Sequence, residues 1–422
     1  MTKSNRLTLW IFIAMILGIA TGYFLHNSYG DSNNPADQES LKGAVEKITI
    51  LTDVFLRLIK MIIAPLVFST LVVGVAKLGD IKAVGRIGGK TMLWFISASF
   101  VSLLLGCVLV NIFQPGHMMN LELPPVDAAT GIDKASMSLK GFITHIFPKS
   151  IVEAMAGNEI LQIVVFSLFF GVGTAAIGEK GLPVIKALDS VGHVMLKVTG
   201  FVMNFAPFAV FGAMTAVVAE KGLGVIATYG VFIGEFYFGL LMLWCVLLFA
   251  AWLLVRHRLK TLITRIKEPL LLAFSTASSE AAFPKTMEQL ERFGCKDKIV
   301  SFVLPLGYSF NLDGSMMYMT FASLFIAQSY GIDMPVSQQI TMLLVLMITS
   351  KGIAGVPRAS LVVIAGTLSA FDIPEAGMLL LLGVDHLLDM GRSATNVVGN
   401  AVATVAVSKW EKSLEHSGPH KD

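Results

Sequence analysis

The sequence places polar and charged side chains inside a long apolar run. The stretch "DHLLDMGRSATNVVGN", residues 385–400, follows "MLLLLG" and runs into "AVATVAV". An ionisable side chain at the centre of a bilayer costs about 2.5–3.5 kcal/mol. Asp385, Asp389 and Arg392 must therefore face polar protein groups, water or a ligand instead of lipid.

These polar residues fall on one face of a helix. At roughly 100° per residue they cover about a third of the circumference over about 22 Å. The stripe consists of Asp385, Asp389, Arg392, Asn396, Gly399 and Asn400. An Asp389–Arg392 pair that only holds a bundle together is the alternative, but the stripe continues past such a pair. Because a guanidinium binds carboxylates at two points, Arg392 beside Asp389 suits a ligand with an ammonium and a distal carboxylate.

A second polar interruption lies in "PLGYSFNLDGSMMYM", residues 305–319. Gly307 and Gly314 allow an unwound segment there. Unwound carbonyls together with the oxygens of Asn311 and Asp313 are the hard ligands that alkali cations take. The alternative is a polar kink that a neighbouring helix satisfies.

Two further motifs have the composition of tight turns. In "STASSEAAFP", residues 275–284, Ser278 and Ser279 would present hydroxyls and N–H groups at a helix N-terminus, which favours an anion. Glu280 is costly at membrane depth unless it is paired or protonated, and the alternative is a solvated loop in which it does nothing. In "SKGIAGVPRAS", residues 350–360, glycines and Pro357 predict a sharp turn, and glycine flexibility suits a lid.

Composition identifies a polytopic membrane protein. Of 422 residues 55% are hydrophobic and 14% charged, whereas a soluble domain has about 25% charged residues. Three distant cysteines form neither a disulfide framework nor a metal motif. We expect contact with membrane lipid, no nucleic-acid partner and no organic cofactor. The first apolar run, 7–25, is long for a signal peptide and has no clear cleavage site, so we interpret it as a first span.

The apolar runs predict about eight transmembrane helices, each needing about 20 residues. The expected spans are roughly 7–25, 48–76, 91–113, 159–178, 196–218, 225–255, 299–328 and 376–408. The runs 269–284 and 338–368 are ambiguous. Basic residues flank the first, while the loops 329–337 and 369–375 around the second have none. The positive-inside rule therefore predicts two re-entrant hairpins from opposite faces, with both termini in the cytoplasm.

Two broken hairpins, each followed by a span with polar residues, form an inverted repeat. That arrangement is typical of secondary transporters that bind their substrate near the bilayer midplane. The motifs "SSE...P", "NLDGS", "AGVP" and "D...DMGR...N...GN" occur in order on these segments. Together they resemble the glutamate transporter family, the dicarboxylate/amino acid:cation symporters, and among them bacterial proton-coupled glutamate/aspartate symporters.

The resemblance implies an all-α elevator-type transporter in the cell inner membrane, assembled as a homotrimer. It implies scaffold helices in 1–78 and 116–222 and a transport domain in 79–115 and 223–408, followed by a cytoplasmic tail, 409–422.

Site roles also follow from the resemblance, residue by residue. Arg392 matches the arginine that holds the side-chain carboxylate, and Asp389 matches the partner of the α-amino group. The remaining substrate-binding positions are Ser278, Ser279, Ser315, Val356, Ser393 and Asn396. We expect cation binding or coupling at Gly307, Asn311, Asp313, Ser350, Asn396, Asn400, Glu280 and Asp385, with a sodium ion at Asn311, Asn396 and Asn400; the role of Glu280 is inferred from its position next to the serines and is not a match to the family.

Departures from the family pattern bear on the coupling ion. Sodium-coupled relatives end the last motif with Gly-Asp, whereas this chain has Gly399-Asn400. In the third span it has Phe95, Ala98 and Ser99 where such relatives have Tyr and Thr-Ser. Because Glu280 adds a titratable group, we expect proton coupling, with sodium as the alternative. A C4-dicarboxylate substrate is the other alternative. A channel is a further alternative, but a channel needs a continuous pore, whereas inverted broken hairpins indicate alternating access. An intramembrane enzyme would need a nucleophile–base set, which Ser279 and Glu280 without a histidine do not supply.

Overall fold

The computed structural model describes residues 3–30, 34–78, 81–118, 123–125, 146–222, 224–350, 359–382 and 384–415. Within these residues the regular elements are helices, with one isolated β-bridge between Cys295 and Leu414. Five described helical segments are long and apolar enough to cross a membrane. The predicted all-α membrane fold is confirmed.

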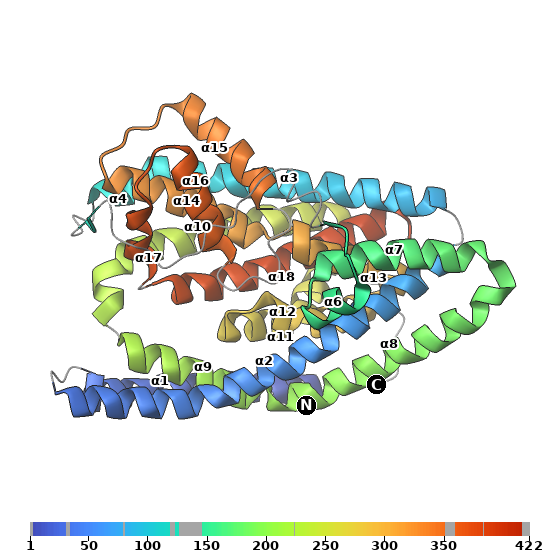
Figure 1. The fold of residues 1–422 in the computed structure, drawn as a ribbon, viewed down its shortest axis with the longest axis horizontal. Helices are drawn as coiled ribbons and strands as arrows, with labels where there is room; N and C mark the ends of the chain where they lie inside the picture. Colours follow the sequence, from blue (N-terminus) through green and yellow to red (C-terminus); the bar gives the residue numbers. More distant parts are fainter. Residues whose placement is uncertain are drawn as a thin grey trace.

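One group of helices lies along the lower side and at the right of Figure 1. Long α2 contacts α7, α8 and α9, and α1 packs along α9. The close approach of α1 to α9 depends on Gly18 and Gly22, where an added Cβ would lie 2.8 Å and 2.7 Å from carbonyl oxygens of α9. The members are α1 (Lys3–Leu25), α2 (Pro35–Leu78), α6 (Ile151–Ala156), α7 (Ile160–Ala176), α8 (Leu182–Val202) and α9 (Ala206–Lys221).

The second group surrounds α18, which runs through the middle of the bundle (Figure 1). The helices α10, α11, α13 and α14 all contact α18. The group comprises α3 (Ile81–Phe113), α10 (Gly224–Val255), α13 (Asp297–Phe310), α14 (Asp313–Ser329) and α18 (Asp385–Trp410), with short α4 (Pro115–Met118) and α17 (Leu379–Leu382). It touches the first group mainly where α13 meets α2.

Two helical hairpins belong to the second group. The first is α11 (Leu259–Thr276) and α12 (Ser279–Phe293), and its ends meet where Arg258 donates a hydrogen bond to the Phe293 carbonyl. The second is α15 (Val336–Thr349) and α16 (Ala359–Ala370), whose arms of 14 and 12 residues are each shorter than the about 20 residues of a full span. The structure thus has the two hairpins that the sequence predicts.

Several predicted spans differ from the observed helices. Predicted span 48–76 is only part of α2, which has 44 residues. Predicted span 196–218 is two helices, α8 and α9, joined by a 3-10 turn at Met203–Phe205. Predicted span 376–408 contains a turn of 3-10 helix (Glu375–Met378) and α17 before α18 begins at Asp385. The seventh span breaks at Asn311 and Leu312, as the glycine pattern predicts.

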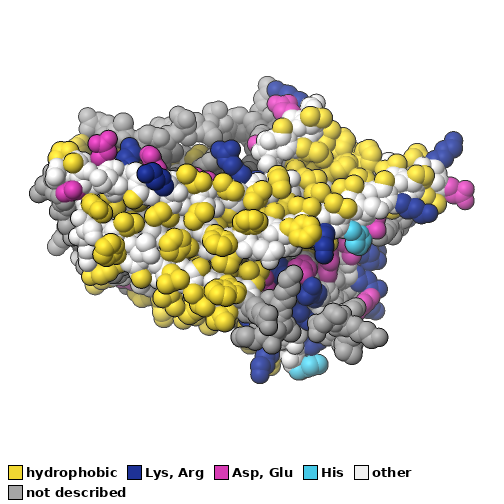
Figure 2. Space-filling view, turned by 90° about the horizontal axis from the view of Figure 1, so that it is seen from below, with side chains coloured by type: hydrophobic (Ala, Val, Ile, Leu, Met, Phe, Trp, Pro, Cys, Tyr) yellow, Lys and Arg dark blue, Asp and Glu magenta, His cyan; other side chains and the backbone are white. Residues whose placement is uncertain are grey.

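The outer face carries many large apolar side chains, which Figure 2 shows over the side that α1 and α9 form. On α1, Trp10 is 60% exposed and Phe24 68% exposed. Soluble proteins rarely expose contiguous apolar surface on this scale. This surface is what a protein in contact with lipid requires.

An ion cluster fixes the end of α18 to the start of α3. Glu411 accepts hydrogen bonds from Arg86 at 2.9 Å and from Lys90 at 2.7 Å. The hydrogen bond from Arg86 is the main reason that the pKa of Glu411 lies below its usual range. Beside them, Trp94 and Trp410 meet edge to face at 5.7 Å.

Candidate functional site

Three groups in the first turns of α18, together with one from α14, form what we call the charged cluster: Asp385, Asp389, Arg392 and, from α14, Tyr318. The Nη2 atom of Arg392 lies 3.2 Å from Asp385 and 3.0 Å from Asp389. The guanidinium lies 4.0 Å from the centre of the Tyr318 ring, and the Tyr318 hydroxyl donates to Asp385 at 3.0 Å. Positions 385, 389 and 392 meet because residues three and four apart share a helix face.

The charged cluster leaves donors unused. Arg392 is only 2% exposed, yet its Nε and Nη1 atoms have no hydrogen-bond partner in the described structure. Leaving a buried charged donor without a partner costs more than about 1–3 kcal/mol. The Asp389 side chain is 35% exposed, whereas that of Asp385 is 7% exposed. The cluster therefore offers an anion two guanidinium donors and offers a cation the accessible oxygens of Asp389.

Further along α18 lies a second group, which we call the amide cluster: Ser102, Asn311, Asp313 and Asn400. Asn311 Nδ2 donates to Asp313 Oδ2 at 3.0 Å and to Asn400 Oδ1 at 3.3 Å. Ser102 of α3 donates to Asp313 Oδ1 at 3.3 Å. Asn311 and Asp313 are 0% exposed, and Asn311 Oδ1 has no hydrogen-bond partner in the described structure.

Two glycines make room for the amide cluster. A Cβ added at Gly399 would lie 1.9 Å from Asp313 Oδ2, and one added at Gly307 would lie 2.3 Å from Asn400 Oδ1. Real Cβ atoms are not found that close to other atoms. These glycines are therefore required for the approach of the polar groups to the α18 and α13 backbones.

Asn396 lies between the two clusters and binds the start of α14. Its Oδ1 accepts from the Gly314 N–H at 2.9 Å and from the Ser315 N–H at 3.4 Å, while its Nδ2 donates to Ser315 Oγ at 3.2 Å. The orphan N–H groups of a helix N-terminus are thus satisfied by a side chain from another helix. The structure joins Asn396 to Ser315, not directly to Asn311 or Asn400.

The turn of the first hairpin is well defined. Ala277 takes a left-handed conformation with φ 47°, and Ser278 caps α12 by accepting from the Ala281 N–H at 3.3 Å. Ser279 and Glu280 occupy the first turn of α12, where a negative charge is favoured. Glu280 makes no ion pair with any described residue. The positive charge of Lys60 on α2 still acts on its carboxylate through space.

The second hairpin contributes less to the described site. Ser350 is buried at the end of α15, with Oγ donating to the Met347 carbonyl at 3.3 Å. The predicted substrate contact at Val356 and the turn around it lie outside the described residues. Ser393 is buried on α18, on the turn that carries Arg392.

This arrangement can be compared with known proteins. The family model described as the sodium:dicarboxylate symporter family matches residues 7–410. The chain belongs to that family.

The curated relatives of this symporter have two kinds of name. The proton/sodium-glutamate symport protein of Geobacillus stearothermophilus is 43% identical over 406 residues, covering 95% of this chain and 93% of the relative. The C4-dicarboxylate transport proteins of Rhizobium etli and Laribacter hongkongensis are 41% and 38% identical, covering 96% of this chain and 90% and 89% of the relatives. These names and the family model confirm two predictions from the sequence. The chain belongs to the family that the motifs indicate, and it is a symporter of that family rather than an enzyme.

Three side chains in the symporter's site were not predicted from the sequence. Tyr318 stacks on Arg392, Ser102 reaches Asp313 from α3, and Trp244 of α10 donates to Thr395 at 2.8 Å. In the sequence, Tyr318 and Trp244 stand among apolar residues, where an aromatic side chain normally packs in the hydrophobic core. A polar tip on a buried ring usually has a partner, and that rule is the only sequence signal that could have found them.

Proposed function

We propose that this symporter imports the acidic amino acids glutamate and aspartate. The observation that carries the proposal is the buried Arg392 with two unused donors beside the accessible carboxylate of Asp389. Arg392 would take the distal carboxylate at two points. Asp389 would take the ammonium, and the first turn of α12 with Ser278 and Ser279 would face the α-carboxylate.

Charge favours an amino acid over a plain dicarboxylate. Asp385, Asp389 and Arg392 sum to one negative charge. A second ligand carboxylate at Asp389 would meet a like charge, which is unfavourable in a poorly solvated site. The relatives named as C4-dicarboxylate transport proteins keep the dicarboxylate as the second candidate substrate.

Competitive uptake by proteoliposomes tests the substrate. Aspartate and glutamate should displace labelled aspartate at concentrations far below those of succinate and malate. Asp389→Ser should weaken amino acid uptake far more than succinate uptake, because only the amino acid loses a charge partner. Asp372→Ser, in a loop outside the site, serves as the control. Preference of the unmodified protein for succinate would assign it to the dicarboxylate carriers.

We propose a proton as the main coupling ion, carried by Glu280. The acid lies at the substrate-facing turn without an ion pair among described residues, close to Lys60 and Tyr308. In the amide cluster, Asn311 Nδ2 points at the oxygens of Asp313 and Asn400, where a cation would have to sit. A flip of that amide would present the unused Asn311 Oδ1 instead, so a sodium site there remains the alternative.

Imposed gradients distinguish the two ions. A proton gradient alone should drive accumulation. Glu280→Gln should keep substrate exchange but lose the response to that gradient, because the amide mimics a permanently protonated acid. Glu153→Gln is a matched control, since Glu153 also lies in the first turn of a helix with a serine N-cap. Full proton-driven accumulation by Glu280→Gln would move the coupling role to Asp313 or Asp385.

We propose that the two helix groups are the scaffold and the transport domain of an elevator in a trimer. The scaffold would comprise 1–78 and 116–222, the transport domain 79–115 and 223–408, and both termini would be cytoplasmic in the cell inner membrane. Cysteines introduced at Ser329 and Ser369 in a Cys245→Ser background should both react with an impermeant reagent from outside. Protection of only Ser369→Cys would mean that residues 338–368 cross the membrane. Native mass spectrometry should give three chains.

A further inference from the structure

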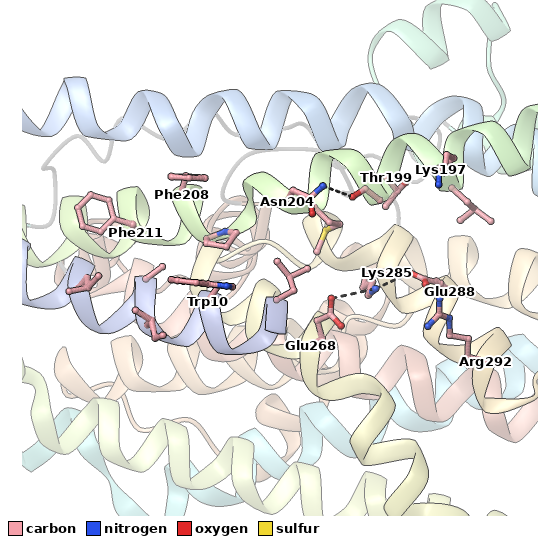
Figure 3. Close-up of a pocket in the computed structure, with 18 of the residues that line it drawn as sticks. Trp10, Lys197, Thr199, Asn204, Phe208, Phe211, Glu268, Lys285, Glu288 and Arg292 are labelled. Atoms are coloured by element: carbon pink, nitrogen blue, oxygen red, sulfur yellow. Dashed lines mark hydrogen bonds and ion pairs between the residues drawn. The ribbon is translucent and has the colours of Figure 1, made fainter. Parts of the chain in front are cut away.

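A cavity of about 1070 Å³ lies between the two helix groups, away from the charged and amide clusters (Figure 3). Helices α1, α8 and α9 form one wall, and α11 and α12 of the first hairpin form the other. Its volume exceeds that of most small-molecule sites, which hold about 300–1,000 Å³. None of the described substrate or coupling residues lines it.

The two ends of this cavity differ in chemistry. Figure 3 shows aromatic rings at one end and charged side chains at the other. The apolar end is lined by Trp10, Leu17, Phe208 and Phe211. The charged end is lined by Lys197, Glu268, Lys285, Glu288 and Arg292. A ligand that fills both ends must be amphipathic.

The charged end has an excess of positive charge. Lys285 lies 3.4 Å from Glu268 and 3.0 Å from Glu288, and Arg292 lies 2.6 Å from Glu288. The two carboxylates are therefore matched by two cations. Lys197 has no carboxylate partner in the described part of the chain and lies 5.6 Å from the Phe201 ring centre. The surplus charge favours an anionic headgroup.

The apolar end is open to the lipid-facing surface. Trp10 and Phe208 are each 60% exposed, and they lie on α1 and α9. We propose that this cavity binds one membrane phospholipid with an anionic headgroup, an acyl chain lying along Trp10 and Phe208 and the phosphate at Lys197 and Arg292. Basic pockets between membrane helices recognise anionic lipids in this way.

The alternatives fit the cavity less well. A soluble phosphate would use the charged end and leave the aromatic end without a function. A second copy of the chain would have to place an acidic side chain beside Lys197, since burying this cation unpaired is costly. A phospholipid satisfies both ends, and it would contact both helix groups at once.

Lipid titration of the purified protein in detergent tests the proposal. Binding is measured by native mass spectrometry with phosphatidylglycerol, phosphatidylcholine and inorganic phosphate as probes. Phosphatidylglycerol should bind more tightly than phosphatidylcholine. Lys197→Ala should weaken phosphatidylglycerol binding roughly fivefold, since a basic side chain near an anionic lipid contributes about 1 kcal/mol. Lys186→Ala, on the same helix but outside the cavity, should leave binding unchanged.

A second variant acts on the space instead of the charge. Gly200 of α8 lines the cavity, and a Cβ added there meets no atom within 4 Å, so Gly200→Leu should place its side chain in the cavity. It should reduce phosphatidylglycerol binding while all charges remain. Equal binding of the two lipids, equal effects of the two lysine variants, or full binding by Gly200→Leu would overturn the proposal. Competition by inorganic phosphate would indicate a soluble anion site, and conversion to a smaller oligomer by Gly200→Leu would indicate a second copy.

Discussion

The charged cluster and the amide cluster both include residues of α18, yet they are built differently. The first uses three full charges and leaves donors of Arg392 unpaired. The second surrounds one carboxylate, Asp313, with neutral amides and a hydroxyl. Unpaired charged donors demand a sizeable anionic ligand, whereas a single carboxylate in a tight neutral shell suits a proton or one small cation. Under the proposed function, the charged cluster would bind the substrate, and the amide cluster would be the alternative site for a sodium ion.

Removing the charge of the first cluster should have the largest effect. Arg392→Cys should lower the affinity for acidic amino acids at least about tenfold, because losing one partner of a buried charge pair costs about 2–5 kcal/mol. Uptake of small neutral amino acids should appear, measured in proteoliposomes. Arg57→Cys, at an exposed arginine of α2, is the control. Unchanged aspartate affinity in Arg392→Cys would exclude the proposed role.

Crowding the second cluster should have the next largest effect. Gly399→Ala places a methyl group against Asp313 and should lower stability by about 1–3 kcal/mol, the usual result of overpacking. Thermal unfolding in detergent measures the change. Gly234→Ala, where an added Cβ meets open space, should not be destabilised. Equal stability of the two variants would show that the amide cluster can accommodate the added methyl group.

Adding a second carboxylate to the amide cluster should change its affinity for a cation. Asn400→Asp adds a second carboxylate beside Asp313, and two carboxylates in one neutral shell favour a bound cation. Apparent sodium affinity in uptake should rise about fivefold, which corresponds to about 1 kcal/mol. Asn204→Asp, outside both clusters, should have no effect on sodium dependence. A sodium response that stays as in the unmodified protein would place the ion elsewhere.

The ion cluster at the far end of α18 should give the smallest effect. Because the pKa of Glu411 is lowered in the folded protein, its stabilisation is present above the pKa of unfolded glutamate, about 4.3, and is lost as pH falls further. Glu411→Gln should cost no more than about 1 kcal/mol at pH 7, since Arg86 is 57% exposed. The melting-temperature difference from the unmodified protein should shrink towards pH 4. A constant difference would assign the effect to packing.

Features that depend on helical periodicity and on the distribution of charges could be predicted from the sequence. The polar face of α18, the break at Asn311 and the two hairpins follow from helical spacing, glycines and the distribution of basic residues. Helix ends were less accurate, because polar residues such as those before residue 48 of α2 continue a helix outside the apolar run. Tyr318 and Ser102 were missed since their contacts join distant helices, which local spacing does not reveal.

The sharing of one guanidinium by two carboxylates has an electrical consequence under the proposed elevator movement. Without substrate, the cluster of Asp385, Asp389 and Arg392 carries one negative charge. Each elementary charge that crosses the membrane exchanges about 2.3 kcal/mol per 100 mV with the field. In a cell that is negative inside, the voltage would therefore drive the empty cluster outward, and a bound acidic amino acid would raise the cluster's negative charge to two, which coupling cations would have to offset.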